Sequence, residues 1–597
     1  MGALIATIAA HAILGVALAA LVWAVGYGWL AAARRGADWL AYPVGLLVCV
    51  LASWLTLLTL WLVPIALLLV APAVLGIRRT VSPALRAAPF AAGLGLLLGS
   101  LLHGPTADES SHAYGDMLFY AAKLASARES VAPFRDLLVA GESSTYVEAG
   151  STFLGASLPF VDPILFQAAT MPAFLVTSLA LGFAWRRVRL VDRDLLAVAP
   201  LAVAVVAYPT WITESPPVAL ALPLAFALYA LARDRLELGE TAVGVVVIGL
   251  AFALTKGFGV IELGVALCFA AAGLRGRVDA RRALAYAVPI VASAAIAFAF
   301  FAVTSGWLTD VLDVKFLPRD AVDGLLDQVD RRDTQAAAPG LLVLGELLLL
   351  VAFARARAFV PLAFLAAAVL GNWFVGGHGF DITVGIAVVV ALLALAERPM
   401  LLRSQLPFVV AGGVALALSA MFRDISGVRD GVVFAGVLGC GVLAALAASR
   451  RSYAFVAVTA VLVAAVVGGR GLTDGTPTLT PAHYDIWREV RANVPRDGIV
   501  FTSETGPEIT GEQGWNYYPG VARRQVYLAG WSSSPLLVDP AQRARRLRLN
   551  ADVVEGRRNP RTVEPGRSSY YLVVRRDARA RGRLVHANDV FALYEIP

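Results

Sequence analysis

The sequence predicts a polytopic, all-α membrane domain of about 13 to 16 transmembrane helices, followed by a C-terminal extracytoplasmic α/β domain. Three observations predict this fold class. The chain has 597 residues, of which 58% are hydrophobic and 16% charged, whereas soluble domains carry about 25% charged residues. Long uncharged runs recur through the first 470 or so residues. After about residue 475 the hydrophobicity falls and the pattern of the sequence changes.

The apolar runs are long enough, in many cases, to cross a hydrocarbon core about 30 Å thick. Short polar breaks separate them. The runs cover approximately 4–30, 39–57, 59–76, 87–102, 163–184, 195–208, 217–232, 241–255, 258–274, 284–303, 340–354, 358–375, 381–396, 405–421, 431–447 and 453–468. We therefore assign residues 1–474 to a multi-span domain.

Arginine clusters predict the orientation of the spans. The clusters are Arg34-Arg35, Arg78-Arg79, Arg186 to Arg189, Arg233 to Arg235, Arg275 to Arg282, Arg355 to Arg357, Arg398 to Arg403 and Arg450-Arg451. With the spans above, every cluster falls on one side, which the positive-inside rule makes cytoplasmic. The other side then receives two long outer loops, 103–162 and 304–339, and everything after about residue 470. The expected location is the plasma membrane, with many passes.

Residues 475–597 predict the small α/β domain. Strand-like runs occur at 498–503, 524–530, 570–576 and 589–596, and helix-like stretches at 483–494 and 540–556. Alternation of strands and helices is typical of such a domain, and roughly 120 residues suffice for one hydrophobic core.

Composition excludes several classes of protein. Cys49, Cys268 and Cys440 all lie within apolar runs, which indicates neither a disulfide framework nor a zinc site. The net charge is +7, and many of the basic residues lie in short clusters between the spans. This distribution indicates a role in orienting the chain in the membrane rather than in nucleic-acid binding. No cleavable signal peptide is evident, because the first run is too long and lacks a basic start.

The stretch HGPTADESSHAYGDM, residues 103–117, gathers acids and histidines where an apolar run ends. If a helix begins near Asp108, then Asp108, His112 and Asp116 share one face at i, i+4 and i+8. Residues 112–126 and 307–333 mix apolar and charged positions, as interfacial helices do. A solvated loop with a helix N-cap explains the same residues, and clustered ionisable groups at membrane depth equally indicate function.

Several motifs together resemble the GT-C superfamily of integral-membrane glycosyltransferases. The acidic motif Asp108-Glu109-Ser110-Ser111-His112 opens a long first outer loop, as in that family. Ala253-Leu254-Thr255-Lys256-Gly257 is similar to a Leu-Thr-Lys stretch in a middle helix of many bacterial members. Glu214-Ser215-Pro216 lies in a short outer loop. Two short segments of the C-terminal domain look like sequences found in actinobacterial members of the family: Trp487 to Val490 and Arg524 to Trp531.

The resemblance implies a polyprenyl-phosphate-linked sugar as donor, and a cell-envelope glycan, lipid or protein as acceptor. A carboxylate would deprotonate the acceptor hydroxyl, since the phosphate leaving group departs without a proton. We expect Asp108 in that role, with Glu109 second. The candidate substrate-binding residues are Lys256, His378 and Asp381 near the phosphate, Glu214 at an acceptor hydroxyl, and His112 and Asp116 beside the base.

Four questions stay open at this point. The Asp, Glu and His side chains could hold a divalent metal, but we expect none to be obligatory. A transporter or flippase for a lipid-linked sugar also has many spans, although such proteins place ionisable groups at mid-bilayer. A polymerase or ligase of the O-antigen type would use Arg423, Arg429 and His378. A scaffold protein whose tail binds glycan is the non-enzymatic alternative.

Overall fold

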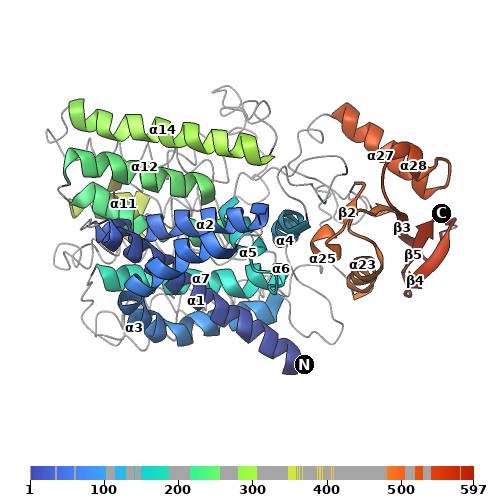
Figure 1. Cartoon of the computed structure of the whole chain (residues 1–597), viewed down its shortest axis with the longest axis horizontal. Helices are drawn as coiled ribbons and strands as arrows, with labels where there is room; N and C mark the ends of the chain where they lie inside the picture. The colour runs from blue at the N-terminus through green and yellow to red at the C-terminus, as the bar shows by residue number, and fades with distance from the viewer. Residues whose placement is uncertain are drawn as a thin grey trace.

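The computed structural model describes the chain in separate stretches. These are residues 2–33, 37–59, 62–102, 115–129, 149–186, 216–234, 236–255, 280–305, 347–357, 481–504, 518–528, 540–578 and 580–597, with Leu137, Ala140 and isolated positions between 360 and 408. A bundle of long helices lies on one side, and a smaller domain built on a sheet lies on the other (Figure 1). The structure thus has the predicted two parts, a helical membrane domain and a C-terminal α/β domain.

The membrane domain is built from apolar helices. Its elements are α1 Gly2–Ala32, a short 3-10 turn η1 Asp38–Leu40, α2 Ala41–Thr59, α3 Leu62–Leu102, α4 Gly115–Glu129, α5 Ala149–Ala156, α6 Pro163–Leu165, the π-helical turn η2 Phe166–Thr170, α7 Met171–Trp185, α10 Pro216–Ala221, α11 Leu224–Arg233, α12 Leu238–Thr255 and α14 Ala280–Ser305. Within the described stretches, five helices are long and apolar enough to cross a membrane. The full span count of the prediction extends beyond these stretches.

Glycines let α1 pack tightly on its neighbours. A Cβ atom on Gly26 would stand 1.7 Å from the carbonyl oxygen of Ala41 in α2, and one on Gly28 would stand 1.8 Å from that of Pro72 in α3. In lipid there is no hydrophobic driving force for helix association, so van der Waals packing between closely spaced backbones supplies much of the attraction. These two glycines therefore fix how α2 and α3 lie against α1.

We expect Gly26→Val to destabilise the membrane domain by about 2–3 kcal/mol, because overpacking against a backbone carbonyl forces α1 and α2 apart. Gly93→Val is the matched control, since a Cβ atom at that position of α3 meets nothing within 4 Å. Thermal unfolding of the detergent-solubilised chain measures both. Equal losses in the two variants would show that helix propensity, not the contact with Ala41, is responsible.

Arginines of the clusters that the structure describes form ion pairs with aspartates of other segments. Arg79 reaches Asp38 at 2.6 Å, which places it beside the start of α2. Arg186 and Asp234 form a paired contact at 3.1 Å between their side chains, which joins two further clusters. One end of the bundle faces the C-terminal domain (Figure 1).

The predicted break between the runs 59–76 and 87–102 is wrong. Residues Leu62–Leu102 form one helix, α3, with Pro72, Pro83 and Pro89 inside it. The arginine pair at 78–79 does not interrupt the helix, because Arg79 is more than half exposed and its side chain pairs with Asp38 and stacks over the Tyr27 ring. A charged side chain can thus be accommodated without ending the backbone hydrogen bonds.

Residues 115–126 of the predicted interfacial helix 112–126 belong to α4, but the side chains from 120 to 127 are covered by protein. Every residue from 120 to 127 in α4 is buried. It packs on α5 and α6 of the bundle and on α25, Pro519–Ala522, of the C-terminal domain. Figure 1 shows α4 between the two parts of the molecule. The helix is therefore part of the junction between the domains.

The C-terminal domain confirms the predicted strands and helices and adds a strand. Its remaining elements are α23 Pro481–Asn493, β1 Ile499–Thr502, β2 Gln525–Val526, α27 Pro540–Val554, α28 Pro560–Val563, β3 Tyr570–Arg575, β4 Arg583–Ala587 and β5 Phe591–Ile596. The sheet order is β2-β1-β3-β5-β4. The β1 strand pairs in parallel with β2 and β3, and β5 pairs antiparallel with β3 and β4. The edge strand β4 was not predicted.

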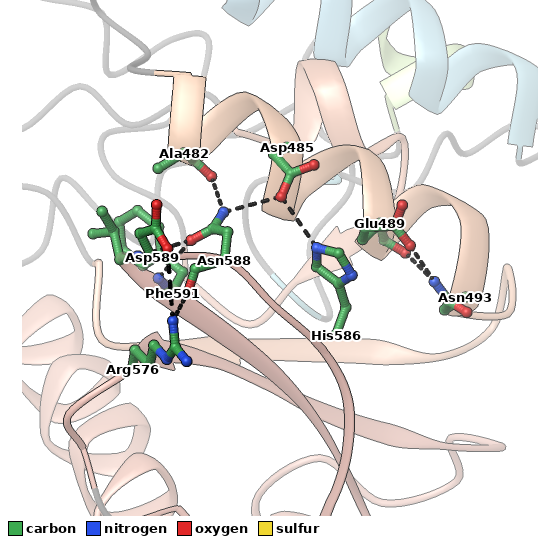
Figure 2. Close-up of polar contacts among 10 residues, drawn as sticks. Ala482, Asp485, Glu489, Asn493, Arg576, His586, Asn588, Asp589 and Phe591 are labelled. Atoms are coloured by element: carbon green, nitrogen blue, oxygen red, sulfur yellow. Dashed lines mark hydrogen bonds and ion pairs between the residues drawn. The ribbon is translucent and has the colours of Figure 1, made fainter.

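Polar contacts attach α23 to the turn between β4 and β5. Asn588 donates to the carbonyl oxygen of Ala482 at 2.7 Å and to the Asp485 carboxylate at 3.1 Å (Figure 2). His586 contacts the same carboxylate at 3.1 Å. On the opposite side of the helix, Trp487 is fully buried in the core. The orientation of α23 about its own axis is thereby fixed.

Candidate functional site

The predicted site residues lie almost entirely outside the described stretches. This holds for Asp108, Glu109, His112, Glu214, Lys256, His378 and Asp381. Asp116 is described as the second residue of α4. The continuous helix that would align Asp108 with Asp116 also includes residues outside the described part, so this alignment stays a prediction.

The two helices that flank the acidic segment locate its ends. α3 ends at Leu102, and Leu98 near its end packs against the hydrophobic cluster that α4 shares with the C-terminal domain. α4 begins at Gly115 and lies between the bundle and the C-terminal domain. The described helices on both sides of the acidic segment therefore reach the junction between the membrane domain and the C-terminal domain.

A buried lysine follows the acidic segment on α4. Lys123 is 7% exposed, and its ammonium group lies 5.8 Å from the centre of the Tyr120 ring. Burial of an ammonium group is costly unless electron-rich partners surround it. Ser126, one turn further along, is also buried. The sequence interpretation missed Lys123, although a single lysine between apolar residues of a short helix was the available signal.

A chain of polar contacts ties three elements together at the junction. Asp162 caps α6, since its Oδ1 accepts hydrogen bonds from the backbone N–H groups of Ile164 and Leu165. Its Oδ2 accepts from Arg523 of the C-terminal domain at 2.8 Å. The N–H of Asp162 donates to Nε2 of His11 in α1 at 3.0 Å. The contact between Asp162 and Arg523 joins positions 361 residues apart.

Arg128 holds the loop that leads to Asp162. Its guanidinium group donates to the carbonyl oxygens of Gly155, Ala156, Leu158 and Val161. Burial, together with the neighbouring charge of Arg523, lowers the pKa of Arg128 to about 10. The group therefore remains charged near neutral pH and fixes the turn between α5 and α6.

Backbone hydrogen bonds extend the sheet of the C-terminal domain towards α4. The N–H of Val526 donates to the carbonyl oxygen of Leu137, and that of Ala140 donates to the carbonyl oxygen of Tyr527. Arg546 of α27 donates to the carbonyl oxygen of Ala140 at 2.7 Å. Part of the first outer loop thus pairs with the free side of β2.

A second group of ionisable residues lies inside the C-terminal domain. The carboxylate of Glu504, which follows β1, lies 3.7 Å from His483 and 3.6 Å from Arg575. The His483 ring stands against the rings of Tyr518 and Phe591. These contacts place an imidazole and a guanidinium group beside a buried acid at the end of β1. Within the described stretches, no group of three His, Cys, Asp or Glu residues could hold a metal ion.

Comparison with protein-family models and with curated proteins finds no match. Among solved structures, the chain is similar to ArnT from Cupriavidus metallidurans bound to undecaprenyl phosphate, with 14% identity and a TM-score of 0.46, over 84% of this chain and 96% of that one. It is also similar to the archaeal oligosaccharyltransferase AglB from Archaeoglobus fulgidus in complex with an inhibitory peptide and a dolichol-phosphate. There the identity is 13% and the TM-score 0.37, over 81% of this chain and 68% of that one.

Proposed function

We propose that the chain is a membrane glycosyltransferase of the GT-C type. It moves a hexose or pentose from a polyprenyl-phosphate donor to an extracytoplasmic glycan, lipid or protein. One observation carries the proposal: α3 and α4, the two helices that flank the acidic segment, both reach the junction between the apolar bundle and the C-terminal domain. A donor anchored in lipid and an acceptor in water can meet only at such a boundary.

Each candidate residue has a stated task in this reaction. Asp108 accepts the proton of the acceptor hydroxyl, with Glu109 beside it, while the bond between the sugar and the phosphate breaks. The phosphate leaves as an anion and needs cationic partners. Lys123 is our choice for this role from the described residues, because it is buried and lies two turns after Asp116 in α4.

The remaining predictions complete the proposal. Lys256, His378 and Asp381 contribute to the phosphate site, Glu214 binds an acceptor hydroxyl, and His112 supports the base. No obligatory metal takes part. The arginine-rich end of the bundle faces the cytoplasm, and the C-terminal domain, whose boundary we place near residue 475, lies outside. The chain crosses the plasma membrane many times.

The test is a turnover assay of the full chain in nanodiscs. The probes are undecaprenyl phosphates that carry a radiolabelled hexose or pentose, offered with a membrane extract as acceptor source. A transferase releases free undecaprenyl phosphate and labels the acceptor. A flippase exchanges the donor between leaflets of a liposome without consuming it, and a scaffold protein does neither. Exchange without consumption would overturn the proposal.

Replacement of Lys123 by Met should raise the KM for the donor roughly tenfold or more, because a charge-assisted contact with the phosphate is lost. Lys123→Arg keeps the positive charge and should retain most of the affinity. Steady-state kinetics at varied donor concentration measure both. A fall in kcat with unchanged KM in Lys123→Met would remove Lys123 from the phosphate site.

A further inference from the structure

The helix before Arg186 marks the position of the bilayer. The candidate span Pro163–Trp185 has 23 residues, which makes it about 34 Å long, close to the thickness of a hydrocarbon core. At its far end Arg186 lies over the Trp185 ring, and such aromatic and basic residues are typical of the interface. Asp162, which directly precedes the span, therefore lies where hydrocarbon gives way to headgroups at the other end.

Arginines gather around Asp162 at this level. Arg523 pairs with its carboxylate, and the next residue, Arg524, donates to the carbonyl oxygen of Arg491 in α23. α23 packs against α25, at whose end Arg523 lies, and Tyr484 of α23 packs on the hydrophobic cluster that contains Ile164, two residues after Asp162. In the described part of the junction, positive charge thus exceeds negative charge.

The α23 helix separates its charges by face. Asp485 and Glu489 lie on the side that contacts His586, Asn588 and Asn493 (Figure 2). Tyr484, Arg488 and Arg491 follow one another at i, i+4 and i+7 and share a different face. Both arginines are exposed. The fixed orientation of α23 therefore presents an arginine face beside Asp162.

An exposed aromatic side chain accompanies the arginines. Phe160, two residues before Asp162, is 71% exposed. An aromatic ring at the boundary of the hydrocarbon core anchors a protein surface to lipid, and neighbouring arginines attract negative headgroups. Apolar and cationic groups at one depth match the chemistry of an anionic phospholipid, which has acyl chains and a phosphate.

We propose that Arg488, Arg491 and Phe160 form a docking surface for an anionic phospholipid, which we call the junction lipid site. The headgroup phosphate pairs with the two arginines, and the first acyl carbons contact Phe160. The bound lipid ties the C-terminal domain to the leaflet beside it. The proposal requires only that the bundle crosses a bilayer, so it stands apart from the proposed sugar transfer.

The experiment titrates the full-length chain in detergent with phosphatidylglycerol and with phosphatidylcholine and counts bound lipids by native mass spectrometry. We expect the wild type to retain phosphatidylglycerol selectively. The double variant Arg488→Gln/Arg491→Gln should weaken that binding roughly 25-fold, since each arginine near a lipid surface contributes about fivefold. Arg488→Lys/Arg491→Lys should restore it, because the charge returns. Phe160→Ser should weaken the binding of both phosphatidylglycerol and phosphatidylcholine.

The matched control is Arg545→Gln/Arg548→Gln, which removes two exposed arginines three residues apart on α27. It should leave lipid retention unchanged. Equal losses in both double variants would overturn the proposal in favour of unspecific attraction by net charge. Displacement of the lipid by millimolar inorganic phosphate, with no effect of Phe160→Ser, would also overturn it and indicate a site for free phosphate. Turnover of the sugar donor is read separately in each variant.

Discussion

Replacement of Asp108 by Asn should lower the rate of sugar transfer about 100- to 10,000-fold, the range typical of a general base. The amide is nearly the same size as the carboxylate but cannot take the proton of the acceptor hydroxyl. The donor phosphate is held by other groups, so donor affinity should change little. Release of undecaprenyl phosphate under saturating donor, together with donor binding to the same protein, measures both quantities.

The neighbouring acids supply the controls. Glu109→Gln and Asp116→Asn make the same chemical change within the same segment, and each should cost much less than Asp108→Asn. If Glu109→Gln had the largest effect, the base would be Glu109 and the acidic segment would keep its role. If none of the three variants slowed transfer, while the wild type consumed donor, the reaction would take place elsewhere in the chain.

The sequence predicted those parts of the fold that depend on local pattern. In the C-terminal domain, β3 and β5 are rich in β-branched and aromatic residues, and both were expected. The strand β4 was missed, because the residues of the edge strand Arg583–Ala587 are all exposed or half-buried and its apolar pattern is weak. The predicted break within α3 was wrong for a different reason. An arginine pair is typical of a loop between spans, but it can also occur within a continuous helix.

The candidate site depends on contacts that no local pattern contains. The Asp162-Pro163 pair is a typical helix start, so the cap on α6 was open to prediction. Its contact with Arg523 joins residues of different domains, and neither residue has a neighbour in sequence that indicates the other. The burial of α4 likewise results from tertiary packing, on α5 and α6 of the bundle and on α25 of the C-terminal domain. The burial of Lys123, which makes it a candidate site residue, therefore could not be predicted from the local sequence.

Replacement of Arg128 by Met should have the largest effect on stability among the described residues of the junction. Met fills a similar volume but donates no hydrogen bond, so the carbonyl oxygens of the turn between α5 and α6 lose their shared donor. Hydrogen bonds from a charged group contribute about 1.5–3 kcal/mol each, and unsatisfied buried carbonyls add a penalty. Because the bonds are not independent, we expect a total loss of about 3–5 kcal/mol.

Thermal unfolding of the full chain in detergent measures this loss, with Arg545→Met in α27 as a control at an exposed position. The stability of Arg128→Lys should be intermediate. An ammonium group keeps the charge but lacks the planar guanidinium fork that reaches several carbonyl oxygens at once. If Lys restored full stability, charge alone would be what matters at this position. Otherwise the geometry of the guanidinium group holds Asp162 in place, and with it the contact through which the C-terminal domain meets the membrane domain.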